Sequence, residues 1–150
     1  MKKIKLSKGK YAVVDDSDFG WINQWKWSFS IGYASRRDEV GKTIYMHRLI
    51  LNTPKGKQTD HINLNRLDNR RSNLRIATAS ENKANEGLRK NNTSGYKGVY
   101  WFGRDQFWIA YITVNKKPIR IGSFATAKKA AIAYDIFAKK HFGNFALTNI

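Results

Sequence analysis

No cysteine occurs among the 150 residues of the chain, so it can form neither a disulfide nor a zinc site built on thiolates. No apolar run approaches the roughly 18 residues that a membrane-spanning helix needs. The first residues, MKKIKLSKGKY, also lack the apolar core of a signal peptide. From these absences we expect a cytoplasmic protein that does not insert into membranes.

Acidic residues are scarce, with 11 Asp and Glu against 28 Lys and Arg and a net charge of +17. A field of this size attracts polyanions, because each neutralised phosphate releases condensed counterions. The excess of positive charge is present in both residues 1–90 and residues 91–150, so it is not confined to a tail. Nucleic acid is favoured as the partner over an anionic membrane surface, because aromatic residues are interspersed with the basic ones in place of a basic amphipathic helix.

Residues 10–57 contain several short strand-like runs rich in aromatic residues, namely YAVVD, SFSIGYASRR and KTIYMH. The sequence DEVGK between the last two is typical of a hairpin turn. A brief helix is predicted through GWINQWKW, with Ser17 or Asp18 as its N-cap. HRLILN predicts a short helical turn that Pro54 ends. We expect a small β-rich scaffold in this part of the chain.

Residues 58–87 predict a strand, a long polar loop, a second strand and a helix. The expected strands are QTDHIN and NLRIAT. Thr78 and Glu81 have the spacing of a capping box, and Gly87 is a natural end for the helix that follows. The polar stretch at 88–94 has little to bury and is predicted to be a linker.

The remaining residues, 95–150, predict a separate unit of three strands followed by one helix. GYKGVYW, FWIAYITV and PIRIGSF are the strands. The helix is predicted from Ala127 to about Phe142, with Thr126 as N-cap and Gly143 past its end.

Side chains alternate between the two faces of a strand, so the small Ala110 and the aliphatic Ile112 suit the helix side. Tyr111, Thr113 and Arg120 then lie on the open face. Such a face has the chemical character needed to contact the major groove of DNA, although an ordinary solvated sheet face would look similar.

The polar stretch TDHINLNRLDNRRSNLR, at residues 59–75, places an acid beside a base. Asp60 is a hard oxygen ligand suited to Mg²⁺, and His61 is suited to taking a proton from water. Asn73 is short and polar enough to tie the loop to the backbone, and Asn82 lies on the first turn of the next helix, where it would complete the metal ligands.

The sequences DHIN, DNRRSNLR and ATASENKANEG, in this order and spacing, resemble the HNH endonuclease family with its ββα-metal fold, in its phage and intron homing branch. The resemblance covers about residues 10–87. It implies that His61 is the general base, that Asn73 has the structural role, and that Asp60 and Asn82 bind Mg²⁺ or Mn²⁺. Asn85 or Glu86 remains an alternative ligand on the same helix. His47 lies outside the motif, and we expect it to pack or to contact a phosphate.

The sequences SGYKGVYW, FWIAYI, IRIGSFATAKKAAIAYDIFAKKHFG and FALTN are similar to the AP2/ERF DNA-binding domain over residues 94–149. The chain has Tyr, Thr and Lys at places where the plant pattern is richer in Arg and Trp, so the plant target sequence does not carry over. The positions that the resemblance implies to face DNA are Lys97, Tyr100, Trp101, Tyr111, Thr113 and Arg120. In the nuclease part the expected phosphate contacts are Arg66, Arg70, Arg71 and Arg75.

The prediction is an α+β chain with a β-rich scaffold leading into a ββα-metal nuclease at 1–87, a linker at 88–94, and a three-stranded antiparallel sheet packed on one helix at 95–150. Its expected function is metal-dependent hydrolysis of double-stranded DNA by a homing-type endonuclease, phage-encoded or bacterial, acting as a monomer or a dimer. The alternatives are a DNA-binding regulator without catalysis and an RNA-binding protein.

Overall fold

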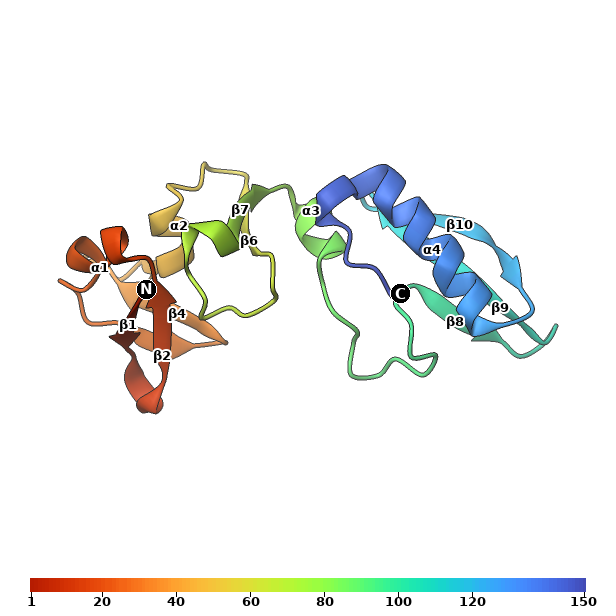
Figure 1. Ribbon diagram of the computed structural model, residues 1–150, viewed down its shortest axis with the longest axis horizontal. Helices are drawn as coiled ribbons and strands as arrows, with labels where there is room; N and C mark the ends of the chain where they lie inside the picture. Colours follow the sequence, from red (N-terminus) through yellow and green to blue (C-terminus); the bar gives the residue numbers. More distant parts are fainter. The chain divides into compact units, whose positions relative to one another are not determined.

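The computed structural model describes residues 1–150, which form two compact units, Met1–Thr78 and Ala79–Ile150 (Figure 1). The sequence predicts a boundary later, at a linker that begins at residue 88. The difference arises from the short helix α3 (Ala79–Ala84), whose Ala84 is buried in the hydrophobic core of the second unit.

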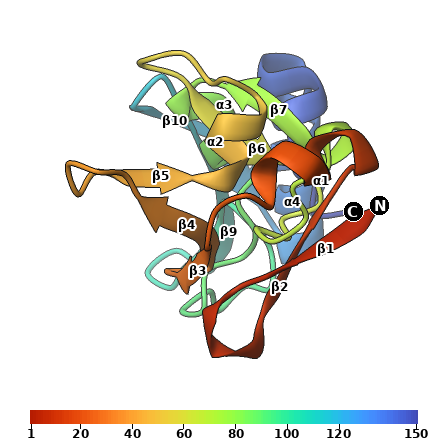
Figure 2. The same ribbon diagram turned by 90° about the vertical axis from the view of Figure 1, so that its left-hand side faces the viewer.

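The first unit begins with an antiparallel hairpin of β1 (Lys2–Lys5) and β2 (Tyr11–Val14), joined by the 3₁₀ turn η1 (Ser7–Gly9) (Figure 2). Strand β1 is not predicted from the sequence. Its apolar contribution to the core is a single side chain, Ile4, set among lysines, so no alternation marks it. A core anchor of this kind is recognised only when the partner strand is known.

Helix α1 (Asp16–Ile22) follows, with Asp15 in the N-cap position. The prediction of Ser17 or Asp18 as the N-cap is therefore wrong. Asp18 lies inside the helix, is 2% exposed and accepts hydrogen bonds from the Arg71 guanidinium at 2.8 Å from both Nε and Nη2. Asp18 is instead paired with Arg71, a residue distant in the sequence, and does not cap the helix.

A three-stranded antiparallel sheet comes next, in the order β3 (Ser28–Ser30), β4 (Tyr33–Arg37) and β5 (Thr43–Tyr45). The expected hairpin turn at DEVGK joins the last two strands. The predicted helical turn is found as α2 (Met46–Ile50). The core of the unit is formed by apolar side chains from the hairpin, α1, the sheet, α2 and β7, namely Ile4, Leu6, Ala12, Val14, Ile22, Trp27, Ala34, Met46, Ile50 and Leu74.

The unit ends with the antiparallel pair β6 (Gln58–His61) and β7 (Leu74–Ala77), with the 3₁₀ turn η2 (Arg71–Asn73) before β7. The long loop between them crosses back to the N-terminal hairpin. There the Val13 N–H donates to Leu67 O and the Asn69 N–H donates to Val13 O, both at 2.8 Å. The hairpin therefore fixes the position of the loop.

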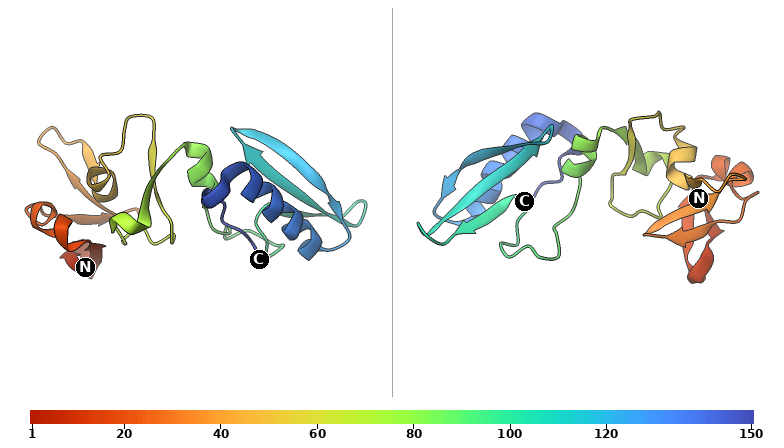
Figure 3. Two further views of the ribbon diagram at one scale, coloured as in Figure 1. Left: turned by 45° about the horizontal axis from the view of Figure 1, so that its top comes forward. Right: turned by 180° about the vertical axis from the view of Figure 1, so that it is seen from behind.

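The second unit contains the predicted three strands and helix (Figure 3). The sheet has the order β10-β9-β8 and is antiparallel, and α4 (Ala127–Phe142) lies along one of its faces. Thr126 caps α4 by accepting a hydrogen bond from Lys129 N, and the helix is followed by the 3₁₀ turn η3 (Gly143–Phe145). The strands are β8 (Val99–Phe102), β9 (Phe107–Val114) and β10 (Lys117–Phe124).

The register of the sheet agrees with the predicted alternation in β9, where Ala110 and Ile112 are buried against α4. It changes in β10, because the pairing shifts between Arg120 and Gly122. This bulge returns Phe124 to the helix side, where it packs on the core. Strict alternation from Arg120 would have placed Phe124 on the open face.

Gly98, just before β8, lies where the chain passes close to α4. Its φ is +72°, and an added Cβ would clash with the Tyr134 ring and with the Tyr111 carbonyl. The C-terminal residues close the same region, since Asp135 on α4 accepts hydrogen bonds from the Asn149 N–H at 2.8 Å and the Ile150 N–H at 3.0 Å. Asn149 in turn accepts from the Lys97 N–H at 2.6 Å.

Candidate active site

Strand β6 places Asp60 and His61 next to each other in the interior of the first unit, where they are 4% and 5% exposed. Asp60 is opposite Arg75 of β7, so the two side chains lie on the same face of the strand pair. Asp60 Oδ2 accepts from Arg75 Nε at 2.7 Å and lies 2.7 Å from Nη2. The charge of the guanidinium offsets part of the desolvation free energy of the buried carboxylate.

The imidazole of His61 is oriented by Asn69, whose Oδ1 lies 2.9 Å from His61 Nε2. An amide oxygen only accepts hydrogen bonds, so the ring proton is on Nε2 and the lone pair is on Nδ1. Burial lowers the pKa of His61, and the hydrogen bond that the ring donates to Asn69 and the charge of Asp60 partly oppose this. The ring is therefore neutral near pH 7, and Nδ1 is its basic atom.

Asn69 is a residue that the sequence did not single out. It is completely buried, its Nδ2 donates to the sulfur of Met46 at 3.4 Å, and its backbone is bound to β2. In the sequence it is one of several Asn residues in a polar loop, a setting in which Asn is mostly a turn former. Only the fold shows that this one points into the protein.

Asn73 joins two parts of the same loop. Its Nδ2 donates to Asp68 O at 2.8 Å, and its Oδ1 accepts from the Asn63 N–H at 3.0 Å. These are contacts of the kind that the predicted bracing role requires.

Asp68 is a second residue that the sequence did not single out. Arg70 holds the pKa of Asp68 below its usual value through a hydrogen bond, with Nη2 at 2.6 Å from Oδ2.

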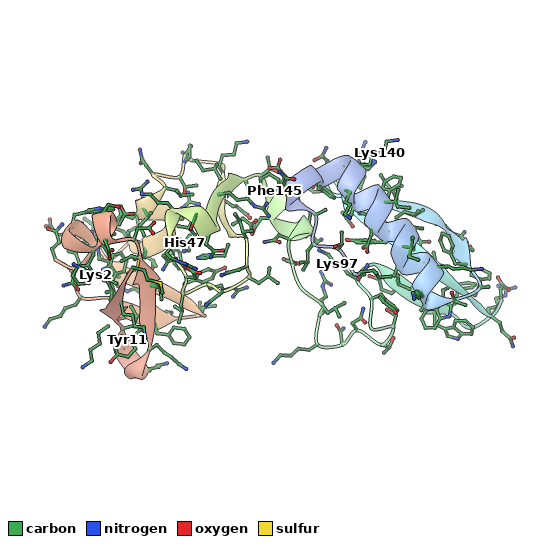
Figure 4. The ribbon with its side chains drawn as sticks, in the orientation of Figure 1. Lys2, Tyr11, His47, Lys97, Lys140 and Phe145 are labelled. Carbon is green, nitrogen blue, oxygen red and sulfur yellow. The ribbon has the colours of Figure 1, made fainter.

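Two rings, those of His47 and Tyr33, lie against His61, and the Tyr45 ring packs on His47. The centroid of the His47 ring lies 5.1 Å from that of His61 in an edge-on arrangement. Tyr33 lies 5.0 Å from His47 and 6.1 Å from His61, and Tyr45 lies 5.6 Å from His47. The base therefore contacts both the Asn69 amide and a cluster of aromatic rings that includes His47, which is labelled in Figure 4.

Residues 52–84, which include Asp60, His61, Asn73 and Asn82, match the family described as HNH endonuclease. The chain belongs to the HNH endonucleases. It is 29% identical over 147 residues to an uncharacterized HNH endonuclease, L560, of Acanthamoeba polyphaga mimivirus, covering 95% of this chain and 76% of the relative. It is 36% identical over 93 residues to Protein 3.8 of Escherichia phage T7, covering 62% of this chain and 76% of that protein. The chain is accordingly a DNA nuclease.

The groups that would hold a divalent metal in this HNH endonuclease are oxygens. Asp60 supplies a buried carboxylate beside the base, and no group of three or more His, Asp or Glu side chains is placed to bind a metal. Mg²⁺ typically takes one or two protein oxygens together with waters and substrate phosphate, and Asp60 fits that mode. Asn82 lies on α3 in the second unit, so its predicted part as a ligand stays a prediction, as do those of Asn85 and Glu86.

The arginines that were expected to contact phosphates make contacts within the endonuclease itself. Arg70, Arg71 and Arg75 form ion pairs with Asp68, Asp18 and Asp60. The Arg66 guanidinium lies over the Tyr33 ring, 4.7 Å from its centroid. These contacts show a structural use for each side chain, and their contact with phosphate stays a prediction.

In the second unit of the endonuclease, the open face of the sheet brings together some of the predicted DNA-facing residues. Tyr111 pairs with Arg120 across the strands, and the Tyr100 ring lies 6.4 Å from that of Tyr111. Thr113 is half-buried on the same face as Tyr111. Trp101, next to Tyr100 along β8, pairs instead with Trp108, with ring centroids 5.1 Å apart.

Lys97 is placed differently from the other predicted DNA-facing residues. Its Nζ donates to the carbonyl oxygens of Ala84 and Lys83 at the end of α3, and burial lowers its pKa to about 8. This lysine therefore provides a donor for the free carbonyl groups at the end of α3.

None of the helices of the endonuclease has the length and apolar character that crossing a membrane requires.

The role of Asn69 leads to a first testable result. Asn69→Leu keeps the approximate size of the side chain but removes the acceptor that fixes the His61 tautomer, so we expect DNA cleavage to fall about 10- to 100-fold in kcat with little change in KM. Asn69→Asp keeps an acceptor and is expected to shift the acid limb of the pH–rate profile upward, because the carboxylate stabilises the imidazolium. A folded Leu variant that cleaves at the wild-type rate would contradict the assigned tautomer.

Proposed function

We propose that the protein is a metal-dependent endonuclease of the homing type in which His61 is the general base. The observation that carries the proposal is the His61–Asn69 hydrogen bond, because it leaves Nδ1 as the basic atom of a neutral, buried imidazole. Nδ1 removes a proton from water as the oxygen attacks the phosphorus atom in line with the leaving oxygen. Asn73 keeps the loop that carries Asn69 in place.

Asp60 is the proposed protein ligand of Mg²⁺ or Mn²⁺, and Asn82 the predicted second one. When bound, the metal supplies positive charge that stabilises the phosphorane and the leaving 3′ oxygen. Arg75 fixes the orientation of the Asp60 carboxylate, since Nε and Nη2 of its guanidinium both lie 2.7 Å from Oδ2.

The second unit is the proposed targeting module. Its three-stranded sheet backed by one helix, with Tyr100, Tyr111 and Arg120 on the open face, supports the AP2/ERF-like interpretation. Basic and aromatic side chains on a sheet face position a protein on duplex DNA through phosphate and base-edge contacts. Action on phage or bacterial DNA inside the cell is part of the same proposal.

The proposal is tested by incubating supercoiled plasmid with the full-length protein in Mg²⁺, in Mn²⁺ and in EDTA. We expect nicked or linear plasmid with either metal and none in EDTA, because the attack needs the charge that the metal supplies. Cleavage positions are then mapped on the DNA that flanks the gene. A few preferred positions are expected for a homing enzyme.

Cleavage that is equally fast in EDTA would contradict the metal requirement. Binding to duplex DNA without cleavage under every metal condition would favour a regulator that lacks catalysis. Cleavage at many unrelated positions would leave the nuclease activity in place but contradict the homing type. Each outcome therefore removes a different part of the proposal.

A further inference from the structure

His47 is a second histidine beside the base, and the HNH motif gives it no role. It lies near the start of α2 and is only 7% exposed (Figure 4). Its ring meets His61 edge-on, is stacked with the Tyr45 ring and also contacts the Tyr33 ring. A group packed against the base is close to the place where the scissile phosphate must lie.

The two nitrogens of His47 are in different surroundings. Nδ1 is buried and has no hydrogen-bond partner. Nε2 is not among the buried atoms that lack a partner. A buried polar group without a partner is rare and costs stability, so it needs an explanation. Packing does not provide one, because a phenylalanine would fill the same aromatic pocket without an unpaired nitrogen.

The protonation state of His47 follows from its burial. Its pKa is lowered to about 3, mainly by burial and in smaller part by electrostatic repulsion from His61, when that ring is protonated, and from Arg48 and Arg66. The ring is therefore neutral near pH 7, and it carries one proton. Placing that proton on Nδ1 would bury an unpaired N–H, so Nε2 carries it and is a neutral donor.

We propose that His47 is a catalytic residue whose Nε2–H donates a hydrogen bond to a non-bridging oxygen of the scissile phosphate. This inference rests on the proposed function, since it needs the phosphodiester at His61. No proton is transferred by His47. The hydrogen bond strengthens as negative charge builds up on the phosphorane oxygens, and a neutral donor provides this without placing a second cation beside the base.

Three variants of the full-length protein test the role of the donor. His47→Phe keeps a ring but has no N–H, His47→Gln places an amide N–H near the position of Nε2, and His47→Asn places one nearer Nδ1. Single-turnover cleavage of plasmid with saturating Mg²⁺ is the measurement. We expect a loss of about 10²- to 10³-fold for Phe and a similar loss for Asn, and a rate within about tenfold of wild type for Gln.

Two further measurements separate catalysis from folding. Thermal unfolding shows whether each variant is folded, and the Kd for duplex DNA in Ca²⁺ is expected to stay within a few-fold of wild type, because the hydrogen bond is made mainly in the transition state. If the His47→Phe variant does not fold, the cleavage rates of the His47→Gln and His47→Asn variants still test the role of the donor. A Gln rate near wild type with a slow Asn variant supports the proposal, and equal rates for the two overturn it.

Cleavage by the His47 and His61 variants distinguishes an error in the role of His47 from an error in the role of His61. If His47→Phe cleaves like wild type while His61→Ala is inactive, His47 makes no such hydrogen bond and the nuclease mechanism stands. If His61→Ala cleaves like wild type, the base itself is wrong. A Phe variant and a Gln variant that are equally slow would assign His47 to positioning the rings and overturn its role as a donor.

Discussion

His61→Ala is expected to slow metal-dependent DNA cleavage by about 10²- to 10⁴-fold, the range that general base catalysis contributes. The neutral imidazole is buried, its Nε2 proton is held by Asn69 at 2.9 Å, and Nδ1 is therefore the atom that takes the proton from water. The alanine variant lacks any group that can take this proton. The rate is measured in single turnovers on plasmid with saturating Mg²⁺, so that chemistry and not product release is observed.

The loss of His61 also leaves Asn69 Oδ1 without a donor inside the protein, which costs about 1–3 kcal/mol of stability. The assay is therefore carried out well below the unfolding temperature of the variant. His141→Ala is the matched control, because this histidine stacks on Phe137 of α4 in the second unit and takes no part in the proposed chemistry. Wild-type cleavage by the His61 variant would show that another group is the base.

Acidification is expected to destabilise the first unit strongly through His47. The pKa of this residue is lowered from 6.5 to about 3 by burial, so the unfolded chain binds a proton on His47 at a higher pH than the folded chain does. Between these two values the unfolded state is favoured as the pH falls. At about 1.4 kcal/mol for each pH unit, the loss reaches about 5 kcal/mol at pH 3, and it is absent above pH 6.5.

His47→Phe isolates this contribution, because it removes the titrating group and keeps a ring. The measurement is hydrogen exchange of peptides from residues 1–78 at pH 7 and pH 4, in wild type and variant. The carboxylates titrate in both proteins, so the difference between the two belongs to His47. We expect the variant to lose less protection on acidification; an equal loss would show that His47 is as easily protonated in the folded chain as in the unfolded one.

Local patterns predicted the elements whose sequence signals lie within a few residues of each other. Helix α4 has its N-cap at Thr126 and ends before Gly143, and the strands β6 and β7 lie within the predicted runs QTDHIN and NLRIAT. Capping and periodicity are properties of neighbours along the chain, which a sequence shows directly. The adjacent Asp60 and His61 were found for the same reason, since order and spacing define the motif.

The missed features depend on residues that are distant along the chain. Asn69 is recognisable only when the loop is seen on β2, and Asp18 only when Arg71, 53 positions later, is beside it. The bulge between Arg120 and Gly122 returns Phe124 to the core, and the glycine in this strand only hints at it, because packing decides which face Phe124 takes. Such interactions are made by the tertiary fold, so propensity and spacing carry no information about them.

The loop that presents Asn69 to the base is held on β2 through the backbone of Val13. During synthesis the β1–β2 hairpin leaves the ribosome well before this loop does, and it is made of local contacts that form quickly. The hairpin residues are therefore available when residues 67–69 are made. Asn69 reaches His61 only when this loop has docked on β2, so completion of the candidate site depends on the joining of the first and last parts of the unit.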